Sequence, residues 1–376
     1  MLYKRMPIEK ESPEEKGADA ILYNLAESSV SDLTFGELNV QLEQLKLEYI
    51  PHRGNEALRQ MIAADAGGLH RDQVLLTNGA AAALFIINTA LLTPQDHLIV
   101  VRPNYATNIE VPVTIGCAIS YIDLHLEENW RINVQAIEAA ITPATRLISI
   151  TTPHNPTGMT VTPQELQALI TIAEKQHIYL LVDETYRDIC FKTTYQVVAS
   201  MSKQVISVSS LSKAYGLPGL RMGWLITQDE GLMEQFLAAK EMMYVSNSAL
   251  DEEVALAFYR QKEKFAVTIN QKALENFHLL TAWLQQETSL EYVLPQGGVV
   301  CFPRFKHPET IDTGRFYEIL LHKHKTMVGA GHWFAMPDWY MRIGFGWLNK
   351  AAFEKGLQCV SKAIHSSTKT PNAEGI

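Results

Sequence analysis

The sequence predicts an α/β fold in which a mostly parallel central sheet is flanked by helices, with a smaller α+β lobe. Five short runs rich in valine, isoleucine and leucine recur through the middle of the chain, at 72–76, 97–101, 145–150, 178–182 and 204–208. Strands buried on both faces have such continuous apolar sequences, which are typical of parallel sheets covered by helices. The segments between the runs carry apolar residues at helical spacing.

The clearest of these helices is expected to begin after Thr162. Thr162 suits the N-cap, Pro163 the first helical position and Glu165 the capping box. A longer helical stretch is expected over 248–287, followed by a strand at 299–302.

A chain of 376 residues exceeds one ordinary hydrophobic core, so we expect two domains. The predicted division has three parts. An N-terminal segment, 1–44, joins the small domain; a large domain, 45–275, carries the sheet; and a small C-terminal domain covers 276–376.

The composition excludes several classes of protein. With 47% hydrophobic and 19% charged residues, the chain is not an extended disordered protein. Its net charge of −9 does not supply the basic surface that nucleic acid requires. No apolar run approaches the roughly 18 residues of a membrane span. The N-terminus lacks the apolar core of a signal peptide and the four cysteines lie far apart, so we expect reduced thiols and a cytoplasmic location.

Residues with useful chemistry follow the five runs, and the carboxyl ends of parallel strands are where open α/β sheets bind ligands. A helix beginning near Ala80 and Ala81 would offer backbone N–H groups to a phosphate. An aromatic ring, a turn amide, a carboxylate and a phenol follow the next three runs, and a lysine with hydroxyls and an arginine follows the last. These residues are, in chain order, Tyr105, Asn155, Asp183, Tyr186, Ser210, Ser212, Lys213 and Arg221.

Together these groups match one ligand. Phosphate donors, a ring for stacking, a carboxylate for a cationic ring nitrogen and a lysine for an aldehyde are what pyridoxal 5′-phosphate (PLP) requires. The sequence therefore predicts PLP as the cofactor. It offers no comparable metal site, because His322 and His324 stand two residues apart without a set of carboxylates or cysteines beside them.

Four motifs in this order also point to a family. They are HNPTG (154–158), DETY (183–186), SLSKAYGLPGLRMGW (210–224) and RIGFG (342–346). From about Tyr49 to Gly346 the chain resembles the fold-type I PLP-dependent enzymes of the aspartate aminotransferase superfamily.

The resemblance implies a role for each residue. Lys213 is expected to form the Schiff base with the cofactor, and Asp183 to pair with its ring nitrogen. Asn155 and Tyr186 would bind the phenolic oxygen, and Tyr105 would stack on the ring. The expected phosphate ligands are Ser210, Arg221, Ser212 and the backbone N–H groups of Ala80 and Ala81.

Three further residues concern the substrate and the partner subunit. Arg342 is expected to bind the α-carboxylate of the substrate as a bidentate pair, and Asn155 is also expected to touch the substrate. Tyr49 resembles the residue that reaches the phosphate across a dimer interface, which implies a homodimer with two shared active sites.

The chain departs from the family pattern in two places. Ala80 and Ala81 stand where many relatives have a hydroxyl residue in the first phosphate turn. The segment 24–28 (NLAES) replaces a glycine-rich segment that often faces the substrate. If Glu27 faces the pocket, its charge would favour a cationic amino acid; the alternative is a solvated or capping glutamate.

The activity expected from the resemblance is transamination between an L-amino acid and a 2-oxo acid by a ping-pong mechanism. The same cofactor chemistry leaves other activities open. These are a β-eliminating lyase of the C–S type, a decarboxylase, an amino-acid cyclase like capreomycidine synthase and, from a different class, a non-catalytic PLP-binding regulator.

Overall fold

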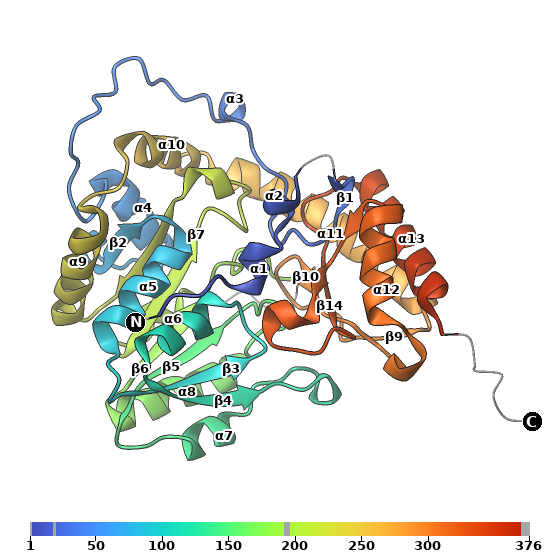
Figure 1. Ribbon diagram of the computed structural model, residues 1–376. Coiled ribbons are helices and arrows are strands. Elements are labelled where there is room, and N and C mark those ends of the chain that lie inside the picture. Colours follow the sequence, from blue (N-terminus) through green and yellow to red (C-terminus); the bar gives the residue numbers. More distant parts are fainter. Residues whose placement is uncertain (1, 18–19, 192–195, 370–376) are drawn as a thin grey trace, which may run out of the picture.

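The computed structural model describes residues 2–17, 20–191 and 196–369. Figure 1 shows a larger lobe built on a central sheet and a smaller lobe formed by the C-terminal part of the chain. Residues 1 and 18–19 of the predicted first domain, 192–195 of the second and 370–376 of the third lie outside the described residues.

The central sheet has seven strands in the order β2-β8-β7-β6-β5-β3-β4. Pairing is parallel from β7 through β6, β5 and β3 to β4, whereas β8 is antiparallel to both its neighbours. The mostly parallel sheet is therefore confirmed. Its strands are β2 (Val74–Thr77), β3 (His97–Arg102), β4 (Ala118–Asp123), β5 (Thr145–Thr151), β6 (Tyr179–Asp183), β7 (Val205–Ser210) and β8 (Gly223–Thr227).

All five predicted strands are present, and the structure adds β4 and β8. β4 lies at the edge of the sheet and has only one fully buried residue, so it lacks the continuous apolar run of a central strand. β8 begins within the last two residues of the lysine-containing motif and is buried along its whole length.

Helices cover both faces of the sheet (Figure 1). Side chains alternate between the faces of a strand. Leu98 and Val100 of β3 accordingly belong to the buried cluster that includes α5 and α9, and Ile99 and Val101 belong to the cluster that includes α4 and α8. The helices of the large lobe are α4 (Glu56–Asp65), α5 (Gly79–Leu91), α6 (Thr107–Ile115), α7 (Val134–Ala139), α8 (Pro163–Gln176), α9 (Glu230–Tyr244) and α10 (Ala249–Tyr259).

α8 begins where the sequence predicts. The Thr162 side chain accepts the N–H of Glu165, and the Glu165 carboxylate accepts the N–H of Thr162 at 2.8 Å, which completes the capping box. Its apolar face, including Leu166, Leu169 and Ile170, is buried against the sheet.

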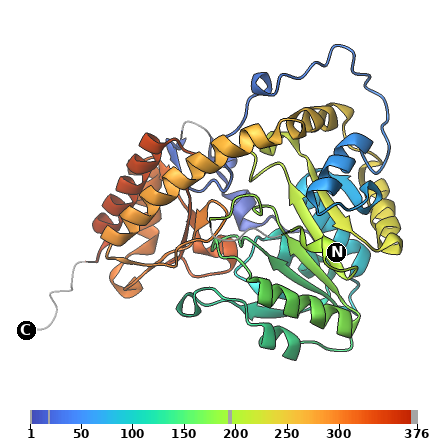
Figure 2. The same ribbon diagram turned by 180° about the vertical axis from the view of Figure 1, so that it is seen from behind.

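The long helical stretch expected over 248–287 is two helices. α10 ends at Tyr259, and α11 (Lys262–Gln286) runs across the predicted domain boundary at 275. Figure 2 shows α11 passing from the large lobe to the small one. The boundary stays a prediction.

The small lobe combines short strands with two helices, α12 (Thr313–Glu318) and α13 (Lys350–Ser367). Its three-stranded sheet, β10-β14-β13, is antiparallel. The N-terminal segment reaches this lobe, because β1 pairs in parallel with β12. The strands are β1 (Tyr23–Asn24), β9 (Leu290–Glu291), β10 (Val300–Cys301), β11 (Arg304–Phe305), β12 (Thr326–Met327), β13 (Gly329–Ala330) and β14 (Met341–Gly344). The N-terminal segment also has three short helices, α1 (Pro7–Lys10), α2 (Pro13–Lys16) and α3 (Phe35–Leu38).

Within the described residues, no helix is both long and apolar enough to cross a bilayer. Cys117, Cys190, Cys301 and Cys359 form no disulfide. The cytoplasmic location stays a prediction.

Candidate active site

The parallel strands bring two of the predicted residues to one edge of the sheet. Asp183 is the last residue of β6, and it is opposite Val208 in the register of β7. β7 ends at Ser210, and the following turn leads to Lys213. The carboxyl ends of β6 and β7 therefore deliver a buried carboxylate and a lysine to neighbouring positions.

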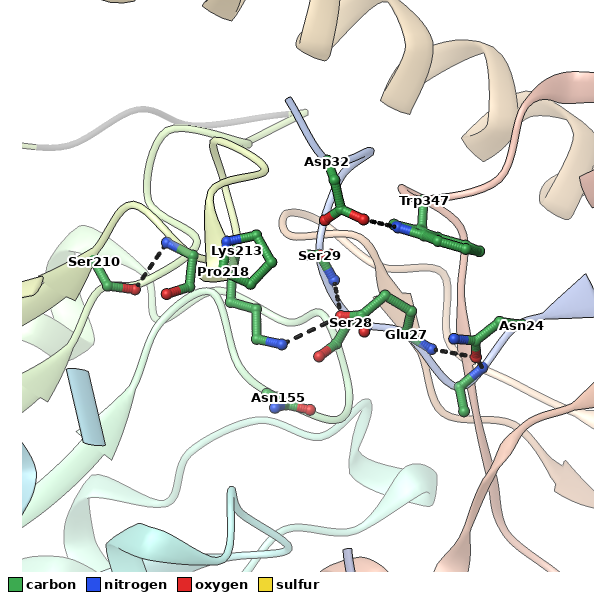
Figure 3. A network of polar contacts seen from close by, with 12 residues as sticks. Asn24, Glu27, Ser28, Ser29, Asp32, Asn155, Ser210, Lys213, Pro218 and Trp347 are labelled. Carbon is green, nitrogen blue, oxygen red and sulfur yellow. Dashed lines mark hydrogen bonds and ion pairs between the residues drawn. The ribbon is translucent and has the colours of Figure 1, made fainter. Parts of the chain in front are cut away.

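Lys213 points away from the sheet toward the N-terminal segment (Figure 3). Its Nζ donates to Oε1 of Glu27 at 3.2 Å. Burial lowers the pKa of Lys213, but the carboxylate of Glu27 together with the phenols of Tyr186 and Tyr105 outweighs this effect, so the pKa lies above its ordinary value. For Glu27 the effects have the opposite sign. Burial raises its pKa, but the charges of Lys213 and Arg342 outweigh burial and lower the pKa to about 2.

Arg342 lies in β14 and is buried, with 3% of its surface exposed. Nη1 donates to Oδ1 of Asn155 at 3.0 Å, and Nη2 donates to the carbonyl oxygen of Ala26 at 2.6 Å. Nε is buried and finds no acceptor among the described residues. An unpaired buried donor is costly, so this guanidinium is equipped to take a further anionic acceptor.

Asn155 follows β5 in the HNPTG turn and is buried. Its Oδ1 is occupied by Arg342, which leaves the Nδ2 amide as a donor toward the site. Tyr186 is also buried, and its hydroxyl donates to the carbonyl oxygen of Ser28 at 2.8 Å. Tyr105 is half-buried after β3; burial raises its pKa, and Lys213 and Asp183 are close enough to affect it. These residues therefore gather around Lys213.

The backbone groups predicted to bind the phosphate lie where β2 meets α5. Gly79 opens α5 with a positive φ of 79°, and Ala80 and Ala81 follow in its first turn. The first N–H groups of a helix have no partner within it and attract anions. A Cβ added to Gly79 would lie 2.7 Å from Nη2 of Arg221, so the arginine lies directly over this helix end.

Ser210 and Ser212 stand close to each other, because Oγ of Ser210 accepts the N–H of Ser212 at 3.3 Å. Both are buried. Tyr49 is not part of this cluster within the single chain: it lies in an exposed segment between α3 and α4, and 86% of its surface is accessible.

The environment of Asp183 indicates whether the residues of the site fit PLP. Burial raises the pKa of Asp183, while hydrogen bonds from Thr185 and Asn108 lower it. Oδ1 accepts Thr185 Oγ1 at 2.6 Å and Thr185 N at 3.1 Å, but none of the described residues forms an ion pair with it. A buried carboxylate without a cation is costly, and the protonated ring nitrogen of PLP would supply that cation. The residues fit the cofactor.

Thr185 and Asn108 were not predicted. Thr185 lies within the DETY motif, and a hydroxyl two residues after an aspartate is a local turn signal. Asn108 belongs to a buried amide and hydroxyl network with Asn104 and Thr151. Nothing in the sequence connects this network to Asp183. As for metals, no group of three His, Cys, Asp or Glu side chains is suitably placed in the described part of the chain.

Comparison with known proteins decides the family. The sequence model of aminotransferase class I and II matches residues 31–358, most of the chain. The chain belongs to this family. The type I PLP-transferase fold is thereby confirmed, and PLP is its cofactor, so the protein is a PLP-dependent enzyme.

Several relatives match three quarters of the chain or more. Capreomycidine synthase of Streptomyces vinaceus is 29% identical over 91% of this chain and 89% of its own length. Arginine–pyruvate transaminase of Pseudomonas aeruginosa is 26% identical over 76% of this chain and 74% of its own length. A PLP-dependent aminotransferase structure from Streptococcus suis superposes with a TM-score of 0.90, is 25% identical and covers 99% of this chain and 100% of its own.

Gly79→Ala tests the phosphate end. The new Cβ would force the Arg221 guanidinium to move, and alanine is strained at a φ of 79°. We expect the Kd for PLP to rise about 10-fold or more, in line with loss of one charge-assisted hydrogen bond. Titration of the apoenzyme with PLP measures it. Gly231→Ala, in α9 with a normal φ and only one atom 3.4 Å away, is the matched control; equal affinities of the two variants would contradict this assignment.

Proposed function

We propose that this enzyme transfers the α-amino group of an L-amino acid to a 2-oxo acid in a ping-pong cycle. The observation that carries the proposal is that Lys213 and Arg342 both contact the segment Ala26–Ser28, the first through Glu27 and the second through the carbonyl oxygen of Ala26. A proton-transferring amine thus stands beside a guanidinium for the substrate carboxylate.

Arg342 fixes the substrate. Its unpaired Nε and its Asn155-bound Nη1 are donors for the α-carboxylate. Arginine–carboxylate pairs of this kind set orientation as well as affinity. Phe334 lies 5.0 Å from the guanidinium carbon and keeps that side of the arginine apolar, which strengthens its attraction for an anion.

Lys213 moves the proton. Bound PLP supplies the electron sink that makes the substrate Cα–H acidic. Nζ of Lys213 would accept that proton and, as general acid, deliver it to the cofactor carbon and not back to Cα, which requires the neutral amine at the first step. The substrate carboxylate on Arg342 directs the Cα–H toward this amine. The hydrogen bonds of Asp183, Asn155 and Tyr186 would hold the cofactor ring in a constant position.

The relatives support this activity. They include enzymes named for the transamination of aspartate, arginine, tyrosine and kynurenine. Because these names differ in the amino donor, they do not select one here. Capreomycidine synthase and the PLP-dependent cyclase OrfR (26% identical, TM-score 0.88, covering 97% of this chain and 98% of its own) make cyclisation the alternative that the test must separate.

We also propose that the active unit is a homodimer in which Tyr49 of each subunit completes the phosphate site of the other. The exposed Tyr49 and the neighbouring Leu47, 85% exposed, support an interface in this segment, since large exposed apolar side chains are typical of contact surfaces.

The half-reaction tests the transfer. The holoenzyme is mixed with a single amino acid in the absence of any oxo acid. We expect one equivalent of the corresponding 2-oxo acid per subunit and a shift of the visible cofactor band toward the near-ultraviolet, with no further turnover until an oxo acid is added. Lys213→Ala is expected to lose both changes.

Other products would overturn the proposal. Continuous release of ammonia with pyruvate would indicate β-elimination, and carbon dioxide would indicate decarboxylation. A cyclic amino acid formed with the cofactor unchanged would indicate a cyclase. Binding of PLP with no reaction of any amino acid would indicate a non-catalytic protein.

The dimer has its own test. Light scattering is expected to give twice the chain mass of 42.2 kDa. Tyr49→Phe is expected to preserve that mass and to raise the Kd for PLP about 10-fold, because it removes one hydrogen bond to a charged group. A monomer with full cofactor affinity would contradict the shared site.

A further inference from the structure

Glu27 has one oxygen fully occupied. Oε1 accepts the N–H of Ser28 at 2.8 Å, the N–H of Ser29 at 2.9 Å and Nζ of Lys213 at 3.2 Å. Figure 3 shows the carboxylate turned toward the lysine from the side of the small lobe. The sequence left open whether Glu27 faces the pocket or caps a turn. In the structure it does both, since it caps its own turn and also contacts Lys213.

The second oxygen has a different environment. Oε2 receives no hydrogen bond from any described residue, yet it is not a buried orphan, since the side chain retains 17% of its surface. An ionised carboxylate accepts hydrogen bonds at both of its oxygens. Oε2 is therefore an unused acceptor on a carboxylate that contacts Lys213 through its other oxygen.

The segment that carries Glu27 is held in place on both sides. Arg342 binds the carbonyl oxygen of Ala26, and Tyr186 binds that of Ser28. β14 packs so closely behind it that a Cβ on Gly344 would lie 1.7 Å from the carbonyl oxygen of Glu27. The carboxylate therefore stays in the site when a ligand enters.

The ion pair between Lys213 and Glu27 opposes the role of Lys213 as a general base, and a cationic substrate would remove this opposition. A general base must be unprotonated, and the anionic Glu27 favours the protonated form of Lys213. A cation on Oε2 would neutralise Glu27 and release the neutral amine. A carboxylate side chain at the same place would be repelled by Glu27 and would leave Lys213 protonated.

We propose that Glu27 binds the positively charged end of the substrate side chain, so that the preferred amino donor is an L-amino acid with a guanidinium or ammonium group. This inference rests on the proposed function, because it assigns the donor of the same site. Arg342 takes the α-carboxylate and Glu27 takes the distal cation.

The first experiment compares kcat/KM of the holoenzyme for L-arginine and for L-norleucine, whose side chain is neutral and unbranched. We expect Glu27→Gln to lower the arginine to norleucine ratio by about 10- to 100-fold, the range of a charge-assisted hydrogen bond. Glutamine keeps the Oε1 acceptor for Ser28 and Ser29, and any general effect on Lys213 cancels in the ratio. Glu27→Asp is expected to restore part of the preference.

Glu354→Gln is the matched control, since Glu354 is an exposed residue on the outer side of α13. It is expected to leave the ratio unchanged. An unchanged ratio in Glu27→Gln would overturn the proposal and leave the capping role as the explanation of this residue.

The second experiment does not depend on turnover. 5-Guanidinopentanoate carries the guanidinium and the carboxylate of arginine but has no α-amino group to react. Calorimetry with the holoenzyme is expected to show at least about 10-fold tighter binding of this acid than of hexanoate, and equal binding of the two in Glu27→Gln.

The two experiments separate the failures. If norleucine is transaminated and both ligands bind the wild type equally, the proposed function holds and the cation site is wrong. If no amino acid is transaminated but the guanidino acid is preferred through Glu27, the cation site holds and the proposed function is wrong.

Discussion

The parallel pairing of β5, β6 and β7 is the constraint on which the rest of the site depends. Parallel strands end at the same edge of a sheet, so the residues that follow them must meet there. Asp183 at the end of β6 and Lys213 after β7 occupy neighbouring positions for this reason, and Asn155 follows β5 beside them. A costly buried carboxylate is tolerated at this edge because Thr185 binds it from its own turn.

The small lobe and the N-terminal segment complete what the sheet begins. Arg342 comes from β14, Glu27 from the segment after β1, and each is tied to a residue of the large lobe, the first to Asn155 and the second to Lys213. In the proposed mechanism the small lobe and the N-terminal segment therefore recognise the substrate, and the large lobe moves the proton. Any change in how the lobes pack would alter the distance between recognition and chemistry.

Much of this arrangement was predictable from sequence because its signals are local. The five apolar runs, the Thr162 capping box and the strand-end positions of Asp183 and Lys213 each depend on a few adjacent residues. β4 was missed because this edge strand exposes most of its side chains, and β8 because its first two residues belong to the lysine-containing motif.

The remaining features depend on contacts distant in sequence. The partner of Glu27 is 186 positions away, and the Asn155–Arg342 pair spans 187. The break between α10 and α11 has no proline or glycine to announce it. Asn108 supports Asp183 through tertiary packing alone, and the proposed role of Tyr49 would require a second subunit.

The most direct test of the account is to identify the lysine that holds the cofactor. Borohydride reduction of the holoenzyme makes the lysine–PLP bond permanent, and peptide mass spectrometry then locates it. The account predicts a single modified peptide containing Lys213 and no modification of Lys240, which is fully buried and donates to the carbonyl oxygens of His52 and Leu76. A label on any other lysine, or bound PLP with no labelled lysine, would contradict the site described here.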